Sequence, residues 1–187
     1  ISIRVLATNF IPSLTPNQPV VKRDHMWHKP RIGVVKINVD ASFSAENMSA
    51  GTGAVARDEH GEFIAAAAWF IPHVVSVDAT EMIAIKNDFY LAGKIGCNIL
   101  HIESDSSNAV SAVNSENLLG QEAAILLESR EMGLDYAKYE VSNCPREANY
   151  VADCIAKSSL ASRTSDFWEG AIPDFISQHF VNDLAIL

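Results

Sequence analysis

Residues 34–43, VVKINVDASF, form the stretch on which the fold depends. Apolar and polar side chains alternate along it, a pattern that indicates a strand with one face turned to a core. Its polar face ends in Asp40, and the small residues Ala41 and Ser42 follow. The sequence therefore places a carboxylate at a strand end, which suits metal chemistry. Taken alone, Asp40 is explained more simply as an acid that ends a strand and enters a loop.

The next segments predict an antiparallel hairpin. Residues 52–57 and 62–70 read as strands, and they flank a short loop that ends in Gly61. Together with the first strand they predict a three-stranded meander. Gly51, Thr52 and Gly53 carry little side-chain bulk, so we expect them to let a substrate backbone approach closely.

A change of period then predicts a helix followed by a parallel strand. Apolar residues recur at helical spacing over residues 78–94, with Glu81 at the edge of the apolar stripe and Gly96 at the expected C-cap. Residues 98–104 read as a strand, and Asp105 falls just past its end. Because a strand reached through a helix runs parallel to its neighbour, Asp40 and Asp105 are predicted at one sheet edge, where such sheets bind ligands.

The rest of the domain is predicted to contain three more helices and one strand. Helices are expected over residues 106–114, 121–132 and 146–160, and a strand over residues 136–141. In the last helix Asn149 and Asp153 are four residues apart and so lie on one side. We expect an N-terminal arm or linker over residues 1–28, one domain over 29–160, and a C-terminal extension over 161–187. This extension either packs back on the domain or serves a protein interface.

Composition limits the function classes. The chain has 187 residues, is 48% hydrophobic, and has a net charge of -9, which argues against broad electrostatic adhesion to nucleic acid or anionic membranes. Its longest apolar run, residues 63–71, is much shorter than the roughly 20 residues of a membrane-spanning helix. Three cysteines without a Cys-x-x-Cys pair indicate neither a disulfide framework nor a zinc site. We expect an intracellular location, nuclear or cytoplasmic, with an organelle also open.

Four acids sit at element ends or beside apolar stripes: Asp40, Glu81, Asp105 and Asp153. If they converge, their mutual repulsion calls for a cation, because carboxylates in a partly buried site disfavour one another's ionisation. Hard oxygen ligands select Mg²⁺ or Mn²⁺. Two such ions about 3.5 to 4 Å apart can activate a water and stabilise the leaving oxygen of a phosphodiester.

Four motifs connect these acids to a known family. They are VDASF at 39–43, GAVARD at 53–58, ESDS at 103–106 and REANYVAD at 146–153. With them the chain resembles the ribonuclease H type 1 family, above all its plant branch of reverse-transcriptase-like domains related to retroelement ribonuclease H. The resemblance implies an α/β fold, ribonuclease H-like, with a five-stranded mixed sheet of order 3-2-1-4-5 and helices on both faces.

The resemblance also implies an activity and a site. It implies an endonuclease that hydrolyses the RNA strand of RNA–DNA hybrids with two Mg²⁺ or Mn²⁺ ions, and that distinguishes RNA by its 2′-hydroxyl. The implied catalytic metal ligands are Asp40, Glu81, Asp105 and Asp153. The implied substrate-binding residues are Ser42, Gly51, Thr52, Gly53, Ser106 and Asn149.

Two departures from the family keep a second function open. The loop at 142–145, SNCP, lacks the His that many of the family's enzymes carry before the last helix. The basic insertion that grips hybrid is also missing, since residues 121–139 contain only Arg130 and Lys138 as cations. The alternative is a retroelement-derived, weakly active or inactive module that acts in protein binding or regulation, with the C-terminal extension as a candidate contact for a protein partner.

Overall fold

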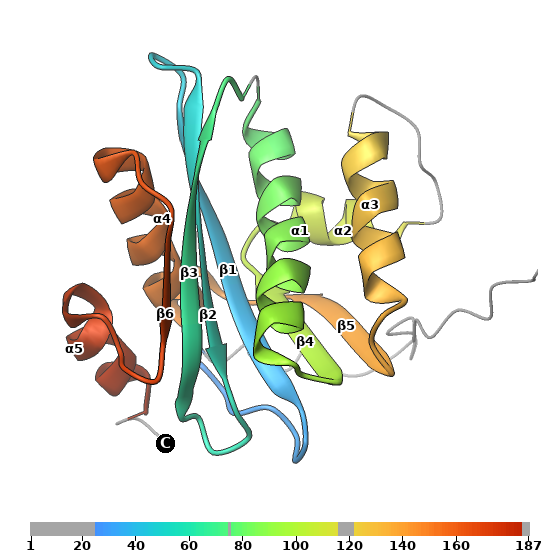
Figure 1. Cartoon of the computed structure of the whole chain (residues 1–187), viewed down its shortest axis with the longest axis vertical. Coiled ribbons are helices and arrows are strands. Elements are labelled where there is room, and N and C mark those ends of the chain that lie inside the picture. The colour runs from blue at the N-terminus through green and yellow to red at the C-terminus, as the bar shows by residue number, and fades with distance from the viewer. Residues whose placement is uncertain (1–24, 75, 116–121, 185–187) are drawn as a thin grey trace, which may run out of the picture.

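A six-stranded mixed sheet forms the centre of the computed structural model, which describes residues 25–74, 76–115 and 122–184 (Figure 1). The strands are β1 (Val35–Ser44), β2 (Ser49–Arg57), β3 (Phe63–Pro72), β4 (Ile99–Ser104), β5 (Lys138–Asn143) and β6 (Asp166–Glu169). The helices are α1 (Val77–Ile95), α2 (Ser107–Asn114), α3 (Ala123–Gly133), the 3₁₀ helix η1 (Arg146–Asn149), α4 (Tyr150–Ser162) and α5 (Asp174–Leu184).

The order of the strands is β5-β4-β1-β2-β3-β6. Its first five members follow the predicted order, read from the opposite edge. The predicted count of five strands is wrong, because β6 pairs antiparallel with β3 from Ala65↔Glu169 to Ala68↔Asp166. In a five-stranded sheet β3 would be an edge strand with unpaired backbone groups, and a short segment from the C-terminal extension satisfies part of that edge.

The predicted parallel pairing of the first strand with the strand after the helix is confirmed. β1 and β4 pair in parallel from Val35↔Leu100 to Val39↔Ser104. Asp40 and Asp105 are the next residues after this last pair. Asp105 lies just past the end of β4, as predicted. The predicted strand end at Asp40 is wrong, because β1 continues to Ser44 and Asp40 still pairs with Gly53 of β2. The predicted helix C-cap is also confirmed, since Gly96 adopts the left-handed conformation with φ 70°.

Helices cover both faces of the sheet, as the resemblance implied. Figure 1 shows α1, α2 and α3 on one face, and α4 and α5 on the other. Ile37 and Val39 of β1 pack in the core beneath α1, while Val55 of β2 packs with Ile155 of α4 and Phe180 of α5. Every residue of β2 is buried, because the strand lies at the middle of the sheet with a helix on each side.

The segments at both ends of the described chain meet around Arg57. The indole N–H of Trp27 donates to Asn38 Oδ1 at 2.7 Å, which holds the N-terminal segment on β1. The Arg57 guanidinium lies between the Trp27 and Phe180 rings, 4.3 and 4.4 Å from their centroids, and its Nη2 donates to Asp183 at 2.7 Å. The C-terminal extension therefore packs back on the sheet through both β6 and α5.

Two further findings concern the described residues only. None of their helices combines the length and apolar character that crossing a bilayer requires. Cys97, Cys144 and Cys154 are free thiols.

Candidate functional site

The four predicted acids line one hollow of about 450 Å³ beside the point where β1 and β4 stop pairing. Asp40 comes from β1, Glu81 from α1, Asp105 from the turn after β4, and Asp153 from α4. Asp40 and Asp153 are 113 positions apart in the chain, so the fold has brought together side chains that the motifs singled out.

Backbone and side-chain hydrogen bonds set the positions of these acids. Asn149 Nδ2 donates to the carbonyl oxygen of Val39 at 2.7 Å, which ties the start of α4 to β1 just before Asp40. Ser106 caps α2 by accepting from Ala109 N at 3.3 Å, and its own N–H donates to Ser104 Oγ at 3.2 Å. The turn that carries Asp105 is therefore held at both sides.

The electrostatics of the hollow are those of crowded carboxylates. Burial raises the pKa of Asp40 to about 9, with further contributions from the charges of Asp105 and Glu81. Burial also raises the pKa of Glu81 to about 7, with contributions from Asp105 and Asp78. Since each carboxylate makes ionisation of its neighbour costlier, the hollow favours a bound cation.

The donor set fits a divalent cation in type. Carboxylate oxygens are the ligands that Mg²⁺ and Mn²⁺ prefer, and the buried Oε2 of Glu81 has no hydrogen-bond partner in the described part of the chain. The set is not assembled, however: over the same residues no three His, Cys, Asp or Glu side chains form a group that could hold a metal ion. The acids thus share a hollow and an electrostatic environment without a closed coordination shell.

Two cations that the sequence analysis did not single out also line the hollow, Arg146 and Lys157. Lys157 Nζ pairs with Asp153 Oδ2 at 2.7 Å, and the lysine is 60% exposed. Among the three other acids, Asp153 contributes least to the raised pKa of Asp40. The spacing of Asp153 and Lys157, four residues apart on a helix, could have indicated the pair.

The predicted substrate-binding residues divide into two groups. Ser42 and Ser106 line the hollow beside the acids. Gly51, Thr52 and Gly53 do not, because all three are buried in β2. A Cβ at Gly51 would lie 2.3 Å from the Ala156 carbonyl oxygen, and one at Gly53 would lie 2.4 Å from Ala156 N. The close backbone approach predicted at these glycines is therefore made by α4 and not by a substrate.

Thr52 and Asn149 have positioning roles in the structure. Thr52 Oγ1 accepts from Asn87 Nδ2 of α1 at 3.0 Å, inside the core. Asn149 is 1% exposed and uses its amide to hold β1. Neither residue is among those that line the hollow.

Comparisons with known proteins agree on the family and the fold. The model of the reverse transcriptase-like family matches residues 38–159, which include all four acids. A search of the curated proteins found no match.

Solved structures with a similar fold include several ribonucleases H. An RNase H1 from the halophilic archaeon Halobacterium salinarum superposes with a TM-score of 0.64 at 16% identity, over 70% of this chain and 99% of that one. The N-terminal RNase H domain of a Mycobacterium tuberculosis protein gives 0.63 at 18%, over 69% and 94%. LC11-RNase H1, solved in complex with an RNA/DNA hybrid, gives 0.62 at 15%, over 69% and 98%. At these identities the likeness establishes a ribonuclease H-like fold.

Proposed function

Because the chain belongs to the reverse transcriptase-like family, we propose that it is a metal-dependent endonuclease that hydrolyses the RNA strand of RNA–DNA hybrids. The observation that carries the proposal is the convergence of Asp40, Glu81, Asp105 and Asp153 on one hollow. The complex of LC11-RNase H1 with a hybrid supports the choice of substrate.

The four carboxylates would hold two Mg²⁺ or Mn²⁺ ions. Bound there, divalent ions supply the Lewis acidity that activates an attacking water and stabilises the leaving oxygen of the RNA phosphodiester. Asp40 contributes charge from β1 and Asp105 from the turn after β4, and Glu81 and Asp153 contribute it from α1 and α4, which cover opposite faces of the sheet (Figure 1). Asn149 keeps β1 and α4 in register, so that Asp40 stays within the cluster.

Other side chains of the hollow suit a phosphate and sugar backbone. Arg146 and Lys157 bring positive charge to the hollow of a protein whose net charge is -9, so attraction to a phosphate is local. The hydroxyls of Ser42 and Ser106 can each donate or accept a hydrogen bond. A hydroxyl placed beside the cut would read the 2′-OH that separates RNA from DNA.

A specific observation favours the alternative, a weakly active or inactive module that acts in protein binding or regulation. As placed, the acids of the described chain form no metal-holding group, and Asp153 is paired with Lys157. The loop after β5 also lacks a His. These features reduce the expected rate, and a module without catalysis would show them too.

A cleavage assay tests the proposal. Purified protein is incubated with RNA annealed to DNA, duplex DNA and single-stranded RNA, with Mg²⁺ or Mn²⁺ and at low salt, which lengthens the reach of the few cations. We expect metal-dependent cutting of the hybrid's RNA strand alone. Asp40→Asn and Asp105→Asn should lower the rate at least about 1000-fold, because each removes ligand charge. Glu81→Gln should be nearly as damaging.

The matched control is Glu131→Gln, which neutralises an exposed acid on α3 that does not line the hollow. It should cut like the wild type. Full activity in Asp40→Asn would identify a contaminating nuclease. Absence of cutting by the wild type, with Mg²⁺ binding intact, would favour the regulatory module. The intracellular location, the plant retroelement origin and a protein partner at the C-terminal extension stay predictions from the sequence.

A further inference from the structure

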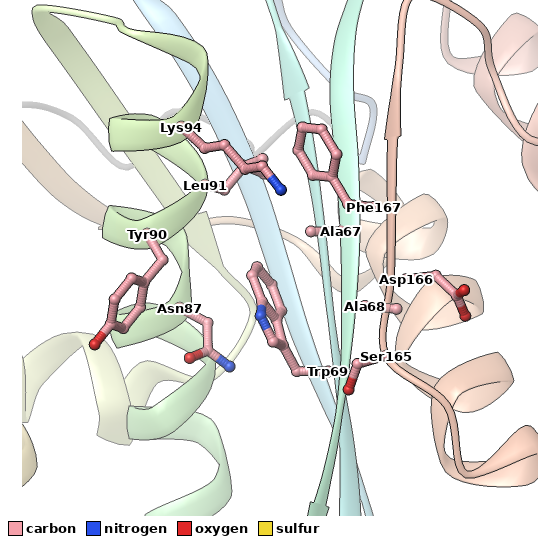
Figure 2. Close-up of a pocket in the computed structure, with 10 residues that line it drawn as sticks. All are labelled: Ala67, Ala68, Trp69, Asn87, Tyr90, Leu91, Lys94, Ser165, Asp166 and Phe167. Carbon is pink, nitrogen blue, oxygen red and sulfur yellow. The ribbon is translucent and has the colours of Figure 1, made fainter.

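A second cavity, of about 590 Å³, lies between α1 and the edge formed by β3 and β6 (Figure 2). It shares no lining residue with the acid-lined hollow. Its volume falls within the range of about 300 to 1,000 Å³ that is usual for small-molecule sites. The cavity therefore needs an explanation of its own.

Aromatic rings from three elements line this cavity. Trp69 comes from β3, Tyr90 from α1 and Phe167 from β6, and Figure 2 shows the Trp69 ring extending toward α1. Between Trp69 and Phe167 the sheet carries only the methyl group of Ala67, whose strand partner is Phe167. The small residue leaves a recess between ring-bearing walls, which suits a flat ring.

The polar groups that face the recess are a lysine ammonium, an amide and an indole N–H. Lys94 Nζ lies 3.8 Å from the centroid of the Phe167 ring, and Figure 2 shows it directed across the recess. The amide of Asn87 and the indole nitrogen of Trp69 face each other from opposite walls in the same view. The carboxylate of Asp166 points away from these groups and accepts from Thr164 Oγ1 at 2.8 Å. The charge presented to a ligand is thus that of Lys94.

We infer that this cavity binds a nucleotide, with the base against the aromatic walls and the phosphate at Lys94. Base stacking on aromatic side chains tolerates any sequence, and a lysine close to a ring adds charge for the phosphate. The Trp69 indole N–H can donate a hydrogen bond to the polar edge of a base, and the Asn87 amide, one of whose N–H groups is used by Thr52 Oγ1, has a second N–H and an oxygen to offer. An aliphatic ligand would make no use of the Trp69 indole N–H or of the charge on Lys94.

The site depends on the C-terminal extension. Ser165, Asp166 and Phe167 form one wall, and all three lie beyond the residues 38–159 that match the family model. Ser165 is fixed there because its Oγ accepts from the Phe70 N–H at 2.9 Å. The inferred site is consequently separate from the proposed cleavage site and does not require it to be active.

The test uses the indole N–H signals of the full chain in ¹⁵N-correlated NMR spectra, without divalent metal. The protein has three tryptophans, and Trp69→Phe assigns the one in the cavity. Titration with adenosine 5′-monophosphate should move the Trp69 signal saturably in the millimolar range. Trp27 is an internal control, because it is 1% exposed and its N–H is bonded to Asn38. Its signal should stay in place.

Two variants separate the base from the phosphate. Tyr90→Ala, at a ring that is 58% exposed, should weaken binding of both adenosine and its monophosphate at least fivefold. Lys94→Met should weaken the monophosphate at least threefold and leave adenosine unchanged. Tyr150→Ala removes another exposed ring, 46% exposed and outside the cavity, and should change neither.

Titration with a single-stranded tetradeoxyadenylate tests whether the natural ligand is a free nucleotide or part of a strand. Binding at Trp69 tighter than that of the monophosphate assigns the site to the unpaired part of a strand, and equal binding assigns it to a free nucleotide. The inference is overturned if the Trp69 signal does not move up to 10 mM ligand, or if Tyr90→Ala and Tyr150→Ala behave alike. It is also overturned if N-acetyl-tryptophanamide binds more tightly than the monophosphate, since the cavity would then take a protein side chain.

Discussion

Lys36, Asn38 and Glu103 form a buried polar cluster on β1 and β4, while Asp40 and Asp105 lie one alternation further along the same two segments. In the first cluster Lys36 Nζ meets Glu103 Oε1 at 2.6 Å, and Asn38 Nδ2 donates to Glu103 Oε2 at 3.1 Å. In the second, two acids face a hollow with two more acids. Opposite charges are paired in one cluster, and like charges gather in the other.

The difference shows how to separate structural from functional polar groups in this fold. A buried ion pair whose atoms are all bonded holds the strands together and needs no ligand. A cluster of buried like charges weakens the free protein and persists where a ligand, here a cation, compensates for it. Both clusters come from the same two chain segments, so the difference between them lies in the charges and hydrogen-bond partners around each side chain.

Breaking the paired cluster should have the largest effect on stability. Glu103→Gln removes the charge that pairs with Lys36, whose side chain is 5% exposed, and leaves an ammonium buried without a counter-ion. The free energy of unfolding should fall by about 3 kcal/mol. Urea unfolding measures it, with the exposed Glu131→Gln as a control expected to change by less than about 0.5 kcal/mol. A loss equal to that of the control would show that the pair does not hold the strands.

A third environment sharpens the comparison, because Asp88 of α1 is fully buried and is paired with no counter-ion in the part of the chain that the structure describes. Among described residues both of its oxygens lack a hydrogen-bond partner, and burial raises its pKa well above the usual value. The folded protein then keeps a proton that the unfolded chain has lost. This contribution therefore lowers stability as the pH rises above about 4.

Asp88→Asn should consequently be more stable than the wild type by about 2 kcal/mol at pH 8 and by little near pH 4. Urea unfolding of both proteins at both pH values gives the difference in their free energies of unfolding. Other ionisable groups affect both proteins equally and cancel in this difference. A difference that does not change with pH would mean that Asp88 finds a partner in solution.

Relieving the unpaired cluster should act in the opposite direction from Glu103→Gln. Asp40→Asn removes one of four crowded carboxylates and should raise the stability of the metal-free protein by about 1 kcal/mol, or roughly 2 to 4 °C in melting temperature. Millimolar Mg²⁺ should raise the melting temperature of the wild type, because it binds only the folded cluster, and should do so much less in the variant. Identical wild-type melting curves with and without Mg²⁺ would contradict the metal site.

The smallest expected effect concerns the ion pair between Asp153 and Lys157 in the acid-lined hollow. Lys157 competes with a cation for Asp153, so Lys157→Met should tighten Mg²⁺ binding about two- to fivefold, the range of an exposed pair. Titration calorimetry measures the affinity without relying on cleavage. Lys86→Met is the control, since Lys86 pairs with Glu128 on α3 outside the hollow. Weaker binding in Lys157→Met would mean that the lysine helps to shape the site.

Local patterns in the sequence were sufficient for the central strands and for the acids. Strand alternation placed Asp105 just past the end of a strand, as the structure has it, but the predicted strand end at Asp40 is wrong, because β1 continues to Ser44. The parallel pairing predicted from the helical crossover is confirmed, and both acids follow its last pair, Val39↔Ser104. The helical stripe placed Glu81 beside the core, and the last motif placed Asp153 on the final helix of the domain. The element types and the parallel pairing could be predicted because period and connection rules act over neighbouring residues.

Only the tertiary structure decided what covers each surface. Gly51 and Gly53 have the composition of a ligand-binding turn, yet α4 occupies the space above them. The segment Asp166–Glu169 is too short for its sequence pattern to predict a strand. It forms β6 because the edge of β3 is otherwise unpaired. The period of each helix or strand can be read from neighbouring residues. The contacts of Gly51 with α4 and of β3 with β6 join residues about a hundred positions apart, so they depend on which faces meet once the chain has folded.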